Sequence, residues 1–235
     1  EIWHYLKKVI EEMKERLLRL YRQLVPICIR SRVSPYDFKQ WLLKQKYKCY
    51  QSLKQYDDII TELKGKNIIT VSFFLYSSSM WKFDDLYRLF EKDPRFKPII
   101  VVCPWLSYDK QTMIGQLEEV EQFCVEKGYS YLCTYNKDQD SWIDIKNELS
   151  PDIIFFAQPY IDNNVKKEYS VINFLDKSLS CYAPYGFNVD RKQLKQFNLL
   201  FHNLMWKGFY ETPIHKMMAE KYADNKGINV EVSGY

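Results

Sequence analysis

Two tyrosines, a proline and a glycine crowd the segment SCYAPYGFNVD, residues 180–190. The segment starts as a short apolar run and then reaches Pro184 and Gly186, both of which favour a turn. In a sheet of parallel strands, ligands bind at the carboxyl ends of the strands. Tyr185 and Gly186 are therefore candidates for contact with a ligand.

A run of three serines, Ser77, Ser78 and Ser79, follows another apolar run and precedes a helical pattern. Amide groups at a helix N-terminus attract anions, so this loop suggests a phosphate-bearing ligand. The alternative, which capping preferences favour, is that Ser79 only caps the helix. The loop contains no glycine, so neither a dinucleotide fingerprint nor a P-loop is present.

Aromatic and amide side chains follow the other apolar runs. They include Trp105, which follows Pro104, and Gln158 and Tyr160, which flank Pro159. With Trp81 and Tyr185, these rings could stack on a sugar or a lipid head group. Packing in the core is the alternative for each of them.

Acid–base and metal chemistry have little support in the sequence. Of three histidines, His4 is expected at the surface, His202 packed in the core, and His215 facing solvent or another domain. No spacing of Ser, His, Asp or Cys indicates a catalytic triad. The six cysteines form no CxxC pair, so we expect reduced thiols, no metal site and no cofactor.

Buried strands must alternate with helices to position these residues. Apolar runs predict strands at residues 67–76, 97–105, 129–135, 151–160 and 180–186. Helical spacing predicts helices from residue 80 to a stop at Asp93 and Pro94, at 110–128 with Gly128 as the C-cap, at 141–149 with Ser141 as the N-cap, and at 166–179. Residues after Gly186 read as helical, including a helix from Thr212 and Pro213 to Asn225. This order predicts an α/β fold with a Rossmann-like open parallel sheet over residues 65–235.

A helical hairpin is expected ahead of that sheet, in residues 1–64. Apolar residues three or four apart predict one helix over 1–24 and a second from Ser34, its N-cap, to Gly65. Charges of both signs on the first helix favour packing on protein over lipid, without deciding whether the hairpin touches a membrane.

Composition limits the class of protein. The chain has 235 residues, 46% of them hydrophobic, and a formal net charge of +4, which is too mild to indicate nucleic-acid binding. No apolar run is long enough to cross a bilayer and no signal peptide begins the chain, so we expect a cytoplasmic location. Because the sequence begins at Glu1 and a strand pattern, GINVEVSGY, closes it, we expect a piece of a longer protein whose next domain begins with that strand.

Several segments resemble the N-terminal half of bacterial CDP-glycerol glycerophosphotransferase-like proteins, relatives of the teichoic acid polymerases and capsule transferases. The resemblance covers about residues 65–235. It rests on the order in which four segments occur: VSFFLYSSSMWKFDDLYRLFEKDPRFKPIIVV, PDIIFFAQPY, CYAPYGF and NLLFHNLMWKGFYETPIHKMMAEKYADNKGINVEVSGY.

The resemblance implies one half of a GT-B fold, the domain that takes the acceptor. A nucleotide-activated donor, CDP-glycerol or a nucleotide sugar, would be held by a C-terminal domain that this chain lacks. The acceptor would be lipid-linked or a polysaccharide, and peripheral association with the cytoplasmic face of the plasma membrane is left open. Alone, residues 1–235 are expected to catalyse no transfer.

The resemblance also assigns the place of the catalytic base. Tyr185 occupies the place of a family histidine that is taken as the catalytic base, while Ser77, Ser78, Ser79, Trp81, Gln158, Tyr160, Gly186 and His202 are expected to bind substrate. A phenol, with a pKa near 10, is a poor base at neutral pH. Either Tyr185 only positions the acceptor, or another group is the base, or the reaction differs. The alternative function is a non-catalytic binding or scaffold domain whose helical hairpin pairs with a partner.

Overall fold

The computed structural model describes residue 16 and residues 18–23, 34–47, 56–161, 165–186 and 193–234. The chain divides into two compact units, residues 1–49 and residues 50–235, which we describe separately. Most of the predicted first helix, with His4, lies outside the described residues, as does the turn after it. The hairpin therefore stays a prediction.

The first unit contains helix α3 (Pro35–Lys46), which begins at the predicted N-cap. The Ser34 hydroxyl accepts a hydrogen bond from Asp37 N at 3.1 Å, and Asp37 Oδ2 accepts one from Ser34 N at 3.2 Å. This reciprocal pair satisfies amides that have no partner inside the helix. Tyr21 and Phe38 are buried against each other edge to face, with ring centroids 5.7 Å apart.

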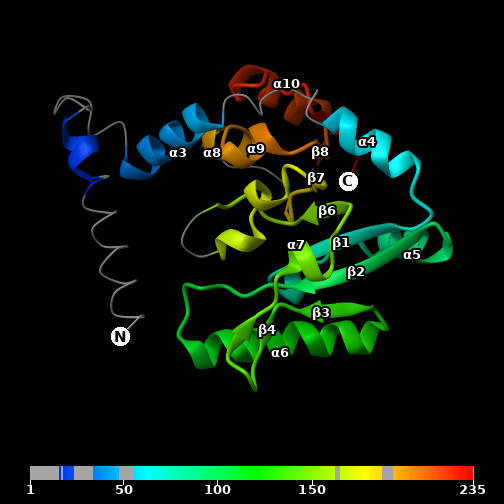
Figure 1. The fold of residues 1–235 in the computed structure, drawn as a ribbon. Helices are drawn as coiled ribbons and strands as arrows, with labels where there is room; N and C mark the ends of the chain where they lie inside the picture. The colour runs from blue at the N-terminus through cyan, green and yellow to red at the C-terminus, as the bar shows by residue number, and fades with distance from the viewer. Residues whose placement is uncertain are drawn as a thin grey trace. The chain divides into compact units, whose positions relative to one another are not determined.

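Seven parallel strands form the sheet of the second unit in the order β3-β2-β1-β6-β7-β8-β9 (Figure 1). This confirms the predicted α/β fold with a Rossmann-like open sheet. The strands are β1 (Ile69–Leu75), β2 (Phe96–Val102), β3 (Tyr131–Cys133), β6 (Ile153–Phe156), β7 (Leu179–Tyr182), β8 (Lys207–Tyr210) and β9 (Val230–Val232).

Aromatic residues fill the core on both faces of the sheet. On one face, Phe73 and Phe155 stack at 5.1 Å under α5 (Asp84–Lys92) and α6 (Lys110–Lys127), whose residues share their hydrophobic cluster. On the other face, Phe156 packs on Phe201 at 5.3 Å. Helix α6 ends as predicted, with Gly128 in the left-handed region at φ 67°.

Helix α4 (Asp57–Lys64) belongs to the sheet unit, although the sequence placed it in the helical hairpin. Its residues Tyr56 and Ile59 form a buried cluster with Leu179 of β7, and the Tyr56 hydroxyl donates to the Leu204 carbonyl. The continuity of one helix from Ser34 to Gly65 is not described, because residues 48–55 lie outside the described ranges.

Two helix predictions are wrong in their details. The segment 166–179 forms the 3-10 turns η4 (Lys167–Tyr169) and η5 (Val171–Phe174), because Ser170 Oγ donates to the Lys167 carbonyl at 2.8 Å and competes with helical hydrogen bonding. Ser141 does not cap a helix. It lies in β5 (Ser141–Trp142), which pairs with β4 (Tyr135–Asn136), and Asp144 caps the short helix α7 (Ile145–Glu148).

Ser79 does not cap α5 either. It lies in the 3-10 turn η3 (Ser78–Met80), and its hydroxyl is 2.9 Å from that of Ser77. Helix α5 begins at Asp84, so Trp81 precedes it.

The C-terminal part contains a strand, β8, that was not predicted from the sequence. After α8 (Gln193–Phe197) and α9 (Leu200–Leu204), β8 pairs in parallel with β7. Helix α10 (Pro213–Tyr222) then begins where a helix was predicted, with Thr212 as its N-cap. Strand β9 pairs with β8 in the same sheet. The expectation that β9 starts a second domain is therefore wrong.

Candidate functional site

The order of the strands defines one edge of the sheet as the place for a ligand. From β1 the chain adds β2 and β3 on one side, and from β6 it adds β7, β8 and β9 on the other. Ligands bind outside the carboxyl ends of the strands of such sheets, near the point where the order reverses. The segments that follow β1, β6, β7, β8 and β9 all lie at this edge.

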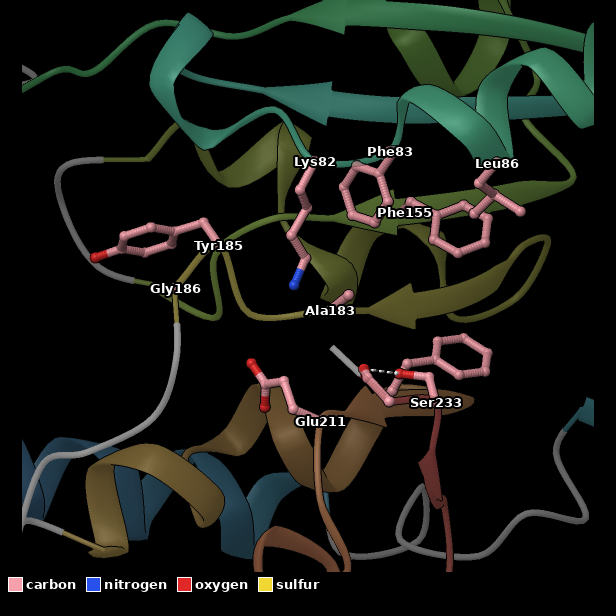
Figure 2. Close-up of a pocket in the computed structure, with 11 residues that line it drawn as sticks. Lys82, Phe83, Leu86, Phe155, Ala183, Tyr185, Gly186, Glu211 and Ser233 are labelled. Carbon is pink, nitrogen blue, oxygen red and sulfur yellow. Dashed lines mark hydrogen bonds between the residues drawn. The ribbon is translucent and has the colours of Figure 1, made fainter.

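A cavity of about 580 Å³ opens at this edge. Phe155, Ala183 and Phe209 line it from the sheet, and residues at the start of α5 line it from above (Figure 2). Residues that follow β8 and β9 close the opposite side. The full lining is Lys82, Phe83, Leu86, Phe155, Ala183, Tyr185, Gly186, Phe209, Glu211, Ser233 and Gly234.

Lys82 and Glu211 place opposite charges on opposite walls of the cavity (Figure 2). Much of Lys82 is exposed, yet partial burial of its ammonium lowers the pKa of Lys82, and the charge of Glu211 opposes that shift. No ion pair between the two is found in the part of the chain that the structure describes. The space between them is therefore suited to a ligand that contacts both.

Glu211 is 7% exposed, which is unusual for a carboxylate that faces a cavity. Its Oε2 lies 3.0 Å from Nδ1 of His215, which is ion-pair distance without hydrogen-bond geometry. Among the described residues Oε1 has no hydrogen-bond partner. His215 itself is buried, so the expectation that it faces solvent or another domain is wrong.

Tyr185 and Gly186 lie at the cavity, as the strand-end argument predicts. Tyr185 is 50% exposed, and its ring flanks the mouth while its hydroxyl points away from Lys82 and Glu211 (Figure 2). Apart from its chain neighbours, no atom of the described residues lies within 4 Å of the point where a Cβ would stand on Gly186. The position of the phenol favours a positioning role for Tyr185.

The serine loop and Trp81 are not among the residues that line the cavity. Ser78 Oγ donates to Glu119 Oε1 at 2.7 Å, and Ser77 and Ser79 contact each other. The Trp81 indole donates to the Tyr129 hydroxyl at 3.1 Å within the aromatic core. These contacts fix the loop between β1 and α5, and hence the start of α5.

Gln158, Tyr160 and His202 also lie away from the cavity lining. Gln158 is 2% exposed and its Oε1 accepts from Tyr160 N at 2.6 Å. His202 is buried on the other face of the sheet, beside Tyr182, where its Nδ1 accepts from Leu199 N at 3.0 Å. This burial agrees with the expected core position of His202.

Neither a metal-binding cluster nor a membrane-spanning helix is found in the residues that the structure describes. No group of three or more His, Cys, Asp or Glu side chains there could hold a metal ion. Cys103, Cys124, Cys133 and Cys181 are free thiols, whereas Cys28 and Cys49 lie outside the described ranges. Within those ranges, no helix has the length and apolar character that a membrane span requires.

Sequence reasoning missed Lys82, Glu211, Phe209 and Ser233 as cavity residues. The signal for Glu211 was present but hidden: it directly follows β8 and precedes the helix start at Thr212 and Pro213. Because β8 was not predicted from the sequence, Glu211 could not be assigned to the carboxyl edge of the sheet.

Comparisons with known proteins found no match. The chain matches no protein-family model, no curated protein and no solved structure.

Proposed function

We propose that this chain is the acceptor-binding α/β domain of a GT-B transferase that builds bacterial cell-surface polysaccharide on the cytoplasmic side of the membrane. The observation that supports it best is the cavity at the carboxyl edge of the sheet, with Lys82 and the buried Glu211 on opposite walls. This is where the domain would offer an acceptor to a donor held by a second domain.

The reaction on this proposal is a direct displacement by an acceptor hydroxyl. The hydroxyl forms the new bond, its proton goes to a base, and the nucleotide departs with the bond that breaks. Transfer of glycerol phosphate from CDP-glycerol releases CMP, and transfer of a sugar from a UDP-sugar releases UDP. Tyr185 is half-exposed and its hydroxyl points away from Lys82 and Glu211, so on this proposal it positions the acceptor and another group takes the proton (Figure 2).

The test is a donor screen on the full-length gene product. CDP-glycerol, CDP-ribitol and UDP-sugars are each supplied with and without a lipid-linked acceptor, and nucleotide release is measured. We expect release from one donor class that rises with the acceptor, and that falls at least tenfold in Lys82→Met. Lys97→Met is the matched control, because Lys97 is exposed at the amino end of β2.

Two results would count against the proposal. Turnover that is equal in Lys82→Met and Lys97→Met would place the acceptor outside this cavity. Absence of both nucleotide release and nucleotide binding with every donor would favour the non-catalytic scaffold.

A further inference from the structure

The cavity carries an unsatisfied buried carboxylate. Both oxygens of Glu211 are inaccessible to solvent, and the side chain is 4% exposed. A buried carboxylate is costly unless it is hydrogen-bonded or paired with a charge. Nδ1 of His215 lies 3.0 Å from Oε2, and no donor of the described residues is in hydrogen-bond geometry with either oxygen.

His215 supplies at most part of what Glu211 requires. Its ring packs beside those of Phe197 and Tyr210, whose centroids lie 6.2 Å and 6.1 Å away. Its contact with Oε2 lacks hydrogen-bond geometry, so it does not satisfy the carboxylate. Oε1 still lacks a donor among the described residues. A charged donor forms a hydrogen bond about twice as strong as a neutral one, so an ammonium fits this position better than a hydroxyl.

The opposite wall of the cavity carries a positive charge, that of Lys82. The Lys82 side chain points into the cavity toward the side that holds Glu211 (Figure 2), and the negative charge of Glu211 opposes the lowering of the pKa of Lys82 by burial. Phe83, Phe155 and Phe209 form the apolar surface between the two charges. An anion at Lys82, joined to a cation at Glu211 by a short carbon chain, would match the charges of both walls.

We propose that the cavity binds a zwitterionic group, with its ammonium on the Glu211 carboxylate and its anionic group on the Lys82 ammonium. This inference rests on the proposed function for the place of the acceptor and adds its chemical class. An acceptor that is a neutral polyol at this point would leave Glu211 without a counter-charge.

Two probes of nearly equal size separate the possibilities. Phosphoethanolamine ends in an ammonium and 2-hydroxyethyl phosphate ends in a hydroxyl, while both carry the same phosphate. Dissociation constants for the 235-residue chain are measured by ligand-observed ³¹P NMR. We expect phosphoethanolamine to bind at least tenfold more tightly.

Variants test which residue contacts each end of the probe. Glu211→Gln should remove the preference for the ammonium, and Lys82→Met should weaken both probes by a similar factor. The controls are Asp85→Asn and Lys97→Met, which change one exposed charge of the same sign outside the cavity lining. Both controls should retain the preference.

Each contrary result has a separate meaning. Equal binding of the two probes, or a preference that survives in Glu211→Gln, overturns the zwitterion and leaves the transferase proposal in place. Absence of binding by both probes also overturns the inference, while the donor screen still decides the transferase proposal. A strong preference in a protein without any donor turnover would support the zwitterion and refute the transferase.

Discussion

Two buried carboxylates at opposite edges of one sheet have different surroundings. Asp152, just before β6 at the amino edge, is 6% exposed and accepts from Lys66 Nζ at 2.6 Å and from Thr70 N at 2.9 Å. Glu211, just after β8 at the carboxyl edge, is 7% exposed and has an oxygen without a partner among the described residues. Asp152 joins strands, whereas Glu211 lines a cavity.

The difference separates the part of the fold that is stabilised from the part that is available to a ligand. At the amino edge, α4 packs on β7 and the Asp152 carboxylate is satisfied within the protein. At the carboxyl edge the same face of the sheet is left open as a cavity. Natural proteins leave buried polar groups unsatisfied mainly where function requires it.

The largest effect that we predict compares two phenylalanines on the same face of the sheet. Phe73→Ala should lower the free energy of unfolding by about 3–5 kcal/mol, because Phe73 is fully buried under α5. Phe209→Ala should cost only about 1–2 kcal/mol, since the ring is half-buried and already borders the cavity. Urea unfolding measures both. Equal losses would show that the cavity wall is packed as tightly as the core.

The two carboxylates give the next comparison. Asp152→Ala should lower the free energy of unfolding by about 1–3 kcal/mol, because Thr70 N loses its acceptor. Glu211→Gln should change it by less than about 0.5 kcal/mol or stabilise the protein, since it removes a buried charge without an ion-pair network. A large loss in Glu211→Gln would instead make the Glu211–His215 contact a structural one.

Tyr185 should matter for binding and not for stability. Tyr185→Phe should leave the free energy of unfolding within about 0.5 kcal/mol of the unmodified value, because the ring is half-exposed. It should also leave probe affinity nearly unchanged, since the hydroxyl points away from the charged pair (Figure 2). Tyr185→Ala should weaken the probe severalfold. A tenfold loss in Tyr185→Phe would give the phenol a direct role.

The smallest effect concerns acid stability at the turn between α5 and β2. Hydrogen bonds from the Arg95 guanidinium and backbone N–H lower the pKa of Asp93 to about 2. Because the pKa in the folded protein lies below the unfolded value of about 4, this contribution is present above pH 4 and is lost as the pH falls toward 2. Asp93→Asn should therefore reduce the loss of stability between pH 5 and pH 2.5 slightly. An unchanged acid profile would show that solvent screens the pair completely.

The sequence predicted the sheet better than its cavity. Continuous apolar runs such as ITVSFFL identified β1 as a strand buried on both faces, and the caps at Ser34, Thr212 and Gly128 are local signals that no distant contact overrides. Strand β8, KGFY, has only four residues and contains a glycine, so pairing with β7 and β9 defines it.

The candidate site was predictable only in part, for the same reason. Tyr185 and Gly186 follow a strand that the sequence shows, and the structure places them at the cavity. Lys82 and Glu211 are 129 positions apart, and only the reversal of strand order brings them to one cavity. Most of the other predicted residues, such as Trp81 and His202, make contacts inside the protein, which residue type and spacing alone do not reveal.

The most direct test of the central claim is an amide ¹H–¹⁵N shift map of the 235-residue chain titrated with phosphoethanolamine and with 2-hydroxyethyl phosphate. If the cavity at the carboxyl edge is the ligand site, the largest shifts should fall on Lys82, Tyr185, Gly186, Glu211 and Gly234 with whichever probe binds. Shifts concentrated at the amino edge around Lys66 and Asp152, or no shifts with either probe, would contradict it.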